Sequence, residues 1–370
     1  MPDMKRARIT CFVVLSGIAI ACLWPFHAPA NHVAWRRVGR GIHLGGHGSV
    51  VSATAFGQAN SIDKTVGTLE LSIEPDTATG RSTILSFDSR LHSGASFLLE
   101  QNGNSLFVQR HNGASSGSCC TAYFGVPNSF QPGKPVVLTV VLTAHDTSVY
   151  IDGALAKTST VFGSSGYNLT GTLVVGNSSV ADNSWSGTIL GLAVYDSSLP
   201  ASEVKEHAQE WGRGNSPTFT ADQFPVALYQ FDEHAGTVAN NSLDRATNLL
   251  IPGRYFVLHP RFLTPIWERY RFGLPKWSYW QDGILNIGGF VPAGLALMNY
   301  FKIVRGGRCP ALATMLLAFV FSLTMECLQW FLPTRDSDMT DVLTNTIGAA
   351  LGASLNGLRP LRGRMGWLSE

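Results

Sequence analysis

Two pairs of polar residues stand one helical turn apart inside apolar sequence, where ionisable groups are rare. Asp282 and Asn286 are four positions apart, and Glu326 and Gln329 are three apart, so each pair falls on one face of a helix. A charged side chain at the centre of a membrane helix costs about 2.5 kcal/mol or more on insertion scales, so it is by default a functional hypothesis. The two pairs predict a polar site between membrane helices.

A third pair, Asp341 and Asn345, repeats the four-residue spacing at the start of the last apolar stretch. Arg335 lies between this pair and Glu326 in the sequence. We expect Arg335 either to pair with Glu326 or to meet an acidic headgroup or anionic substrate at the interface. The predicted binding pocket consists of Asp282, Asn286, Glu326, Gln329, Arg335, Asp341 and Asn345.

A purely structural interpretation of these residues stays open. In it, the amides join helices by hydrogen bonds, Asp341 caps a helix, and Gly348 and Gly352 let two helices approach closely. Glu326 fits this interpretation less well, because a residue that only joins helices has no need to be ionisable.

Other candidate chemistry is weaker. Glu70 and Glu74 share a strand face but lie about 13 Å apart at 3.3 Å per residue, beyond the separation of paired glycosidase carboxylates, and Asp76 follows a proline. Residues 113–117 spell G-x-S-x-G, but in a Ser/Gly loop without the strand and helix of a nucleophile elbow. The sequence therefore does not favour a hydrolase.

Metal and disulfide signals are also incomplete. His43 and His47 are four apart, but the glycines around them disfavour a helix, and no further motif completes a zinc site. Cys119 and Cys120 are adjacent, so they form either a strained vicinal bridge or two free thiols.

Apolar runs of the length needed to cross a membrane position the predicted pocket. They cover 9–24, 283–301, 310–332 and 339–357, the last being the weakest because it is rich in Thr, Asn and Gly. The first run is either a retained anchor or a signal peptide. Basic clusters before the first run, between the second and third, and after the fourth predict cytoplasmic termini and place the polar pairs on the outer side.

The composition agrees with membrane segments and argues against nucleic-acid binding. Charged residues make up 14% of the 370 residues, where soluble proteins have about a quarter, and the mean hydropathy is +0.11. Twenty-seven basic and 25 acidic residues leave a formal charge of +2, so no general positive field would hold a polyanion.

Residues from about 40 to 215 have all-β composition, with β-branched runs separated by turn signals. Leu69, Leu71 and Ile73 alternate along one predicted strand, and Asn102-Gly103 and Asp152-Gly153 predict hairpin turns. The first helix expected in this part is 201–211. Many short strands without a fixed repeat indicate a two-sheet sandwich or jelly roll.

Several of these segments resemble the LamG or concanavalin A-like jelly-roll family. The runs YIDGALAKT (150–158), GTLVVGN (171–177) and WSGTILGLAVYDSSLPASEV (185–204) are similar to its hairpin, inner strand and ending. ALYQFDEHAGTV (227–238) looks like the family's opening strand but follows the rest, so it either closes the sandwich from the C-terminal side or is a linker. The resemblance implies recognition of glycan or protein, with calcium common in the family but no ligands assigned here.

The polar pairs carry a second resemblance, to the VanZ-like membrane family. The pattern D...N...F.P.G is met by Asp282, Asn286, Phe290, Pro292 and Gly294. The pattern E..Q.....R.....D...N..G...G is met by Glu326, Gln329, Arg335, Asp341, Asn345, Gly348 and Gly352. This resemblance implies a multi-span envelope protein, one namesake being linked to teicoplanin resistance, and makes the β-rich segment an insertion between the first two spans.

We therefore expect a multi-domain membrane protein of the bacterial cytoplasmic membrane, with about four transmembrane helices and a jelly-roll sandwich outside. The expected parts are an N-terminal anchor or signal peptide (1–30), a β-sandwich (40–250), an interfacial linker (251–281) and three spans (282–364). The linker carries an aromatic belt of Trp267, Tyr270, Trp277, Tyr279 and Trp280.

The predicted function is binding or modification of a cell-envelope component by the outward pocket, under a glycan- or protein-binding sandwich. Its partners would be membrane lipids or a lipid-linked envelope precursor, and a glycan or cell-surface protein. Two alternatives remain: a membrane enzyme acting on a lipid-linked or headgroup substrate with Glu326 as general base, and an adhesion module that the spans merely anchor. Catalysis is left open, with a binding protein favoured.

Overall fold

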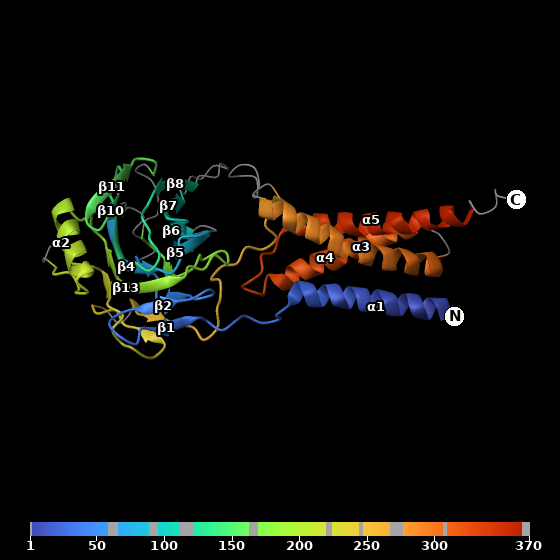
Figure 1. Cartoon of the computed structure of the whole chain (residues 1–370), viewed down its shortest axis with the longest axis horizontal. Helices are drawn as coiled ribbons and strands as arrows, with labels where there is room; N and C mark the ends of the chain where they lie inside the picture. Colours follow the sequence, from blue (N-terminus) through green and yellow to red (C-terminus); the bar gives the residue numbers. More distant parts are fainter. Residues whose placement is uncertain are drawn as a thin grey trace. The chain divides into compact units, whose positions relative to one another are not determined.

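The computed structural model describes residues 2–57, 66–88, 95–111, 121–162, 169–219, 224–243, 247–266, 277–305 and 309–364. The G-x-S-x-G loop and Cys119 and Cys120 lie outside these residues. The chain forms two compact units, one of Met1–Ala28 with Arg261–Glu370 and the other of Pro29–Pro260. The first unit is helical and the second is built mainly of strands (Figure 1). This confirms the predicted fold class of a helical bundle and an all-β sandwich.

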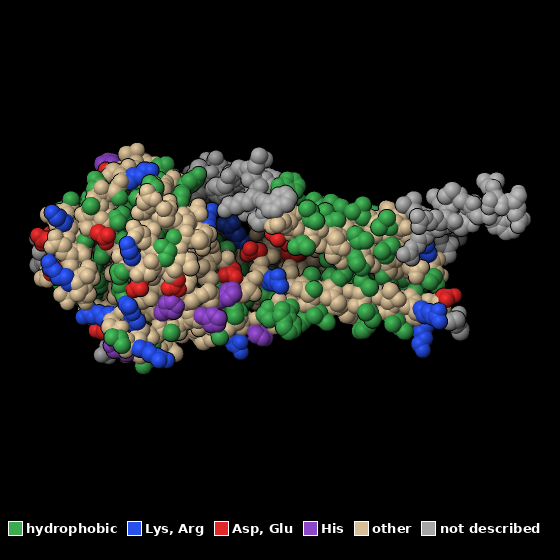
Figure 2. Space-filling model, viewed as in Figure 1, with side chains coloured by type: hydrophobic (Ala, Val, Ile, Leu, Met, Phe, Trp, Pro, Cys, Tyr) green, Lys and Arg blue, Asp and Glu red, His purple; other side chains and the backbone are tan. Residues whose placement is uncertain are grey.

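The helical unit contains α1 (Pro2–Leu23), α3 (Trp277–Arg305), α4 (Pro310–Gln329) and α5 (Met339–Arg364). Within the described residues, three stretches are long and apolar enough to cross a membrane: Asp3–Leu23, Trp280–Val304 and Pro310–Gln329. The predicted fourth span does form a helix, α5, but this helix is not among the three. Figure 2 shows hydrophobic side chains along the visible face of this unit.

Helices α3 and α5 pack with their backbones in contact, and glycines make this possible. A Cβ atom on Gly348 would lie 2.2 Å from the carbonyl oxygen of Ile287, and one on Gly352 would lie 2.1 Å from that of Val291. From the other side, a Cβ on Gly294 would lie 2.0 Å from the carbonyl oxygen of Ala349. The close approach expected from the glycine pair is confirmed.

The β unit is a sandwich of two antiparallel sheets. Along the first sheet the strands are β1 (Val33–Trp35), β2 (Ile42–Leu44), β13 (Gly187–Tyr195), β4 (Gly67–Pro75), β9 (Val136–Leu142), β10 (Thr147–Ile151) and β11 (Ala154–Ser159), with β14 (Ala227–Tyr229) also paired to β13. Along the second they are β15 (Val238–Ala239), β16 (Leu249–Leu250), β3 (Val50–Ser52), β12 (Thr172–Val175), β5 (Arg81–Asp88), β6 (Ala95–Asn102), β7 (Ser105–His111) and β8 (Thr121–Val126).

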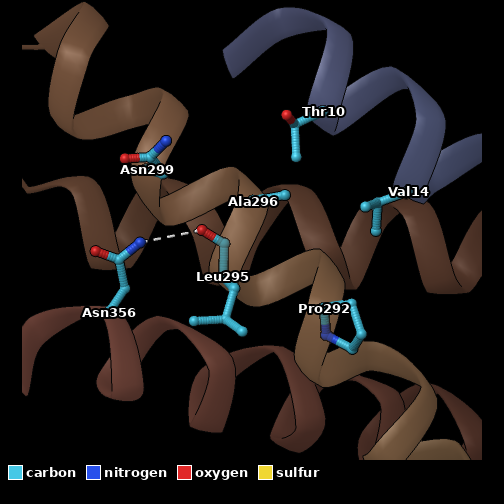
Figure 3. Close-up of a pocket in the computed structure, with 7 residues that line it drawn as sticks. All are labelled: Thr10, Val14, Pro292, Leu295, Ala296, Asn299 and Asn356. Atoms are coloured by element: carbon cyan, nitrogen blue, oxygen red, sulfur yellow. Dashed lines mark hydrogen bonds between the residues drawn. The ribbon is translucent and has the colours of Figure 1, made fainter. Parts of the chain in front are cut away.

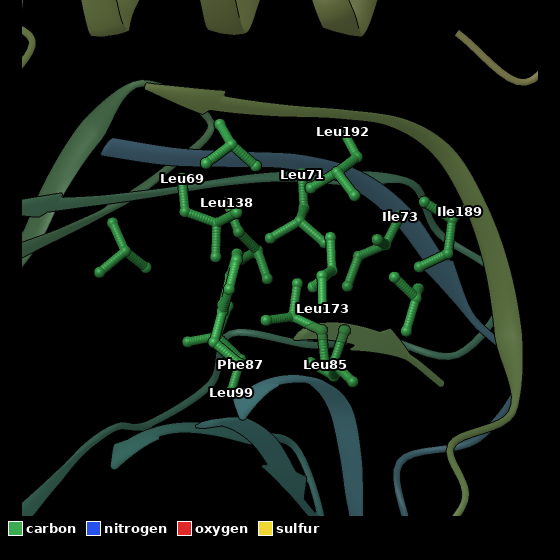
Figure 4. Packing of buried hydrophobic residues seen from close by; sticks show 14 of the residues in the cluster. Leu69, Leu71, Ile73, Leu85, Phe87, Leu99, Leu138, Leu173, Ile189 and Leu192 are labelled. Carbon is green, nitrogen blue, oxygen red and sulfur yellow. The ribbon is translucent and has the colours of Figure 1, made fainter. Parts of the chain in front are cut away.

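The core of the sandwich lies between the sheets and follows the two-residue period of the strands. Leu69, Leu71 and Ile73 of β4 are fully buried there and pack against residues such as Phe87 and Leu173 of the second sheet (Figure 4). The Asn102-Gly103 turn joins β6 to β7, and the Asp152-Gly153 turn joins β10 to β11, as predicted.

The segment that resembles an opening strand closes the sandwich from the C-terminal side. Strand β14 pairs with β13 through Leu192↔Tyr229, and β16 pairs with β3 through Leu249↔Ser52. The aromatic side chains of Tyr229 and Phe231 are buried in the core. Of the two alternatives left open by the sequence, closure is therefore correct.

Helix α2 (Ala201–Gly212) packs on the outer face of the first sheet, and a buried carboxylate joins them. Glu70 of β4 is fully buried and accepts hydrogen bonds from the Tyr195 hydroxyl (2.8 Å) and the Trp211 indole N–H (3.2 Å). Nδ1 of His207 lies 3.0 Å from the other carboxylate oxygen. We call these four residues the Glu70 cluster.

Candidate functional site

Glu326 lies in a buried stripe along α4. The residues of the helix that face inward repeat every three or four positions: Thr314, Ala318, Ser322, Met325, Glu326 and Gln329. Only 2% of Glu326 is exposed, so its carboxylate is buried inside the helical unit. The spacing predicted from the sequence thus places the Glu326–Gln329 pair inside the helical unit.

The partner of Glu326 is the start of α5. Its Oε2 accepts a hydrogen bond of 2.9 Å from the backbone N–H of Asp338, which is itself 96% buried. Asp338 Oδ1 in turn accepts a 2.7 Å hydrogen bond from the backbone N–H of Thr340, as an N-cap residue does. Two carboxylates therefore fix the end of α4 against the beginning of α5.

Asp338 is the main residue around Glu326 that the sequence interpretation missed. The expectation that Asp341 caps the helix is wrong: Asp341 lies in the first turn of α5, and its backbone N–H donates to the carbonyl of Asp338. The signal was available, because Asp338 immediately precedes the first helical residue, where caps stand.

The segment before α3 holds the loop between α4 and α5 in place. The backbone N–H of Thr264 donates to the carbonyl of Ser337, and that of Met339 donates to the carbonyl of Thr264. Ser337 is 99% buried. The loop between α4 and α5 is thus fixed on both sides by backbone hydrogen bonds.

Two further predicted residues reach α1. Gln329 Nε2 donates to the carbonyl of Cys22 at 3.0 Å, and Arg335 Nη2 donates to the carbonyl of Trp24 at 2.9 Å. Among the described residues there is no ion pair between Arg335 and Glu326, so the pairing suggested by the sequence is not formed. Arg335 is exposed, and its guanidinium donates to the Trp24 carbonyl just beyond α1 instead.

Asn345 completes the cluster on the α5 side, where its Nδ2 donates to the hydroxyl of Ser322 at 2.9 Å. Ser322 is fully buried and was not predicted. Three buried polar atoms of this region have no hydrogen-bond partner within the described part of the chain: Gln329 Oε1, Asn345 Oδ1 and Thr340 Oγ1. The arrangement can therefore offer hydrogen bonds to a polar ligand that reaches it.

The predicted residues gather only in part. Glu326, Gln329 and Asn345 take part in the hydrogen bonds described above, and Arg335 reaches the carbonyl of Trp24 just beyond α1. Asp282 is exposed and Asn286 half-buried on α3, and within the described residues neither side chain has a hydrogen-bond partner. We name Glu326, Gln329, Asp338, Asn345 and Ser322 the Glu326 cluster.

A separate pocket of about 280 Å³ lies between α1, α3 and α5 (Figure 3). Asn356 donates to the carbonyl of Leu295 across it at 3.2 Å. Its lining residues are Thr10, Val14, Pro292, Leu295, Ala296, Asn299 and Asn356. Thr10 precedes Cys22 by twelve residues, or about 18 Å of helix, so this pocket is distinct from the Glu326 cluster.

The aromatic belt predicted before the second span is described only in part. Trp280 is 56% exposed, as an interfacial aromatic residue would be, but the side chains of Trp267, Tyr270, Trp277 and Tyr279 lie outside the described residues. Across the described residues, no three His, Cys, Asp or Glu side chains gather closely enough to hold a metal ion.

Two family models match the chain. The one described as VanZ/LLP1 matches residues 224–358, and the one described as the concanavalin A-like lectin/glucanases superfamily matches residues 45–205. "Protein VanZ" of Enterococcus faecium is 41% identical over 78 residues, which are 21% of this chain. The match spans 45% of the length of that relative.

Solved structures with a similar β unit are distant. A candidate carbohydrate binding protein from Bacteroides ovatus ATCC 8483 has a TM-score of 0.40 and 12% identity, with 61% of this chain and 59% of that chain covered. An SAP-like pentraxin from Limulus polyphemus has a TM-score of 0.37 and 16% identity, with 59% of this chain and 94% of that chain covered. With scores this low, these likenesses carry no argument about ligands.

The apolar helices and the family match together indicate a membrane protein. Of the motif residues, Glu326, Gln329 and Asn345 belong to the Glu326 cluster, and Gly294, Gly348 and Gly352 form the α3–α5 contact. The chain therefore carries a VanZ/LLP1 domain in its C-terminal part and a concanavalin A-like domain within residues 45–205.

Proposed function

We propose that this protein is a multi-pass protein of the bacterial cytoplasmic membrane whose Glu326 cluster binds or acts on a polar component of the cell envelope. In this proposal the concanavalin A-like domain lies outside the membrane and recognises a glycan or a cell-surface protein. The component would be a membrane lipid or a lipid-linked precursor, because the cluster lies in a bundle of apolar helices.

One observation carries this proposal: an ionisable residue that is 2% exposed lies in a helix apolar enough to span a membrane, surrounded by polar side chains with unused hydrogen-bonding atoms. Burying a carboxylate there is costly, and an amide would join the helices equally well. Retaining a carboxylate at this cost is explained if its charge or its proton is used.

The test is Glu326→Gln in a strain that lacks the chromosomal gene. Gln keeps the acceptor for the Asp338 N–H but removes the charge. We expect the variant to accumulate in the membrane at the level of the unmodified protein and to fail to restore the envelope lipids, peptidoglycan precursors and glycopeptide sensitivity of the parent strain. Thr324→Ala, on the exposed face of the same helix, is the matched control and should complement fully.

Arg335→Gln and Asp341→Asn should resemble Glu326→Gln, whereas Glu203→Gln on α2 should not. Full complementation by Glu326→Gln at normal abundance would show that the cluster serves packing alone.

The side of the membrane on which each segment lies is tested independently with reporters fused after residues 216, 306, 335 and 370. We expect those at 216 and 335 to be active only outside, and those at 306 and 370 only inside; cytoplasmic activity at 216 would refute the arrangement.

A further inference from the structure

A second polar surface lies in the β unit, near the start of β13. It follows the segment leading into β13, in which alternate residues point to one side. Trp185 points inward and is 99% buried. The polar residues that face solvent at least in part are His43, His47, Asp76, Asp182, Ser184 and Ser186, and we call them the histidine–aspartate strip. Figure 2 shows histidine side chains together with acidic ones on the visible face of this unit.

Two His–Asp pairs of the strip are held slightly too far apart to bond to each other. His47 Nε2 lies 3.5 Å from Asp182 Oδ2, and His43 Nε2 lies 3.7 Å from an oxygen of Asp76. An N–H···O hydrogen bond in proteins spans about 2.7–3.2 Å. All four side chains are between 22% and 43% exposed, so each gap opens to solvent.

The carboxylates of both pairs are held by hydroxyl groups of the β unit. The buried hydroxyl of Tyr255 donates to Asp182 Oδ1 at 2.6 Å, which leaves Oδ2 facing His47. The Ser186 hydroxyl donates to Asp76 Oδ2, the same oxygen that faces His43, and His43 Nδ1 lies 3.3 Å from the Thr188 hydroxyl. The polar atoms that face the gaps are therefore held in place before any ligand arrives, which lowers the entropy cost of binding.

The backbone at His47 has an unusual conformation. His47 has a φ of +62°, in the left-handed region, and its N–H donates to the Ser184 hydroxyl at 3.0 Å. A Cβ on the next residue, Gly48, would lie 2.8 Å from the carbonyl oxygen of His32, so only glycine fits there. Non-glycine residues held in this conformation are enriched at functional sites.

We propose that the histidine–aspartate strip binds an uncharged saccharide, with one hydroxyl bridging each His–Asp pair from the solvent side. A hydroxyl is both donor and acceptor, so it can donate to the carboxylate and accept from the imidazole N–H at the same time. Asp182 and Ser186 are four residues apart in the segment that leads into β13, which spans at most about 13 Å when extended and so suits a chain of sugars rather than one ring. The two carboxylates make the strip negative at neutral pH, so acidic sugars are excluded by like charge.

This inference rests on the proposed glycan recognition by the concanavalin A-like domain and names its site and ligand class. The test uses the full chain in lipid nanodiscs, applied to an array of glucans, mannans, galactans, N-acetylglucosamine oligomers and polygalacturonate. We expect binding to at least one neutral glycan and none to polygalacturonate. For the best neutral glycan, Asp182→Asn and His47→Asn should each raise the Kd at least tenfold.

These substitutions preserve the fold, because Asn at 182 still accepts from Tyr255 and Asn tolerates the left-handed conformation at 47. Asp232→Asn and His145→Ala, exposed elsewhere on the same unit, are the controls and should stay within twofold. If Asp182→Asn or His47→Asn lowers the melting temperature, His43→Gln and Asp76→Asn test the other His–Asp pair instead.

The outcomes separate the two proposals. Binding to a neutral glycan that the strip variants leave unchanged would overturn this site while leaving glycan recognition intact. Binding to polygalacturonate would overturn the uncharged ligand class. No binding to any neutral glycan would overturn this inference and remove glycans from the proposed function, leaving a protein partner for the domain.

Discussion

Glu70 and Glu326 are both buried carboxylates, one in each unit, but their surroundings differ. Glu70 is fully buried and meets three side-chain groups, of Tyr195, His207 and Trp211. Glu326 is 2% exposed and accepts the backbone N–H of Asp338, and polar atoms of its neighbours Gln329 and Asn345 remain unpaired within the described chain. Burial of a charge thus does not by itself identify a binding site; unused hydrogen-bonding capacity around it is the more informative feature.

The largest effect is expected for Glu70→Ala. It leaves the buried polar groups of Tyr195, His207 and Trp211 without their acceptor, and breaking a buried pair in this way costs about 3–5 kcal/mol. Unfolding of the purified protein, followed by tryptophan fluorescence, should show this loss. Glu74→Ala, four residues along the same strand face and paired with the exposed Arg36, should cost at most about 1 kcal/mol. Equal effects of the two would contradict a structural role of the Glu70 cluster.

An intermediate effect is expected for Gly294→Ala in the helical unit. The new Cβ would lie 2.0 Å from the carbonyl oxygen of Ala349, so α3 and α5 must separate, at about 1–3 kcal/mol. The amount of protein in the membrane, measured by immunoblot, should fall. Gly289→Ala in the same helix meets nothing within 4 Å and should leave the amount unchanged. This pair separates damage to packing from the loss of charge tested by Glu326→Gln.

The smallest effect is a pH dependence of the β unit. Burial disfavours a charged His207, but the hydrogen bond and the attraction of Glu70, with Glu203 and Glu210 adding to it, outweigh burial and raise the pKa of His207 above 6.5. A group with a raised folded-state pKa contributes stability that is fully present below its unfolded pKa and is lost as the pH rises through the folded value.

The β unit should therefore be slightly more stable at pH 6 than at pH 8 through this residue. Thermal melts of the unmodified protein and of His207→Gln at the two pH values measure the contribution. The difference between the two proteins should shrink as the pH rises; a difference that grows would reverse the assigned sign.

Local patterns in the sequence were sufficient for much of the architecture. The alternation of Leu69, Leu71 and Ile73 predicted a strand with these residues on one face, and the two hairpin turns were correctly placed. The i, i+3 spacing of Glu326 and Gln329 predicted a shared helix face, which is buried. Such patterns are reliable because periodicity and turn chemistry act over a few residues.

Partners that are distant in the chain could not be read in this way. Pairing with Glu326 was one of two expectations for Arg335, but the guanidinium donates to the carbonyl of Trp24, and the backbone N–H of Asp338 donates to the carboxylate. Spacing alone argued against a catalytic role of Glu70, but only the tertiary structure shows that α2 covers it.

What the sequence by itself determined is the division into apolar helices and a β-rich part, the polar residues of the helices, and the glycines at which two helices meet. Only the tertiary structure decided which groups those polar residues touch, and that the polar side chains of residues 182–188 line up with His43 and His47. Hydrogen bonds depend on tenths of an ångström and on direction, and these are set by the packing of whole elements rather than by spacing along the chain.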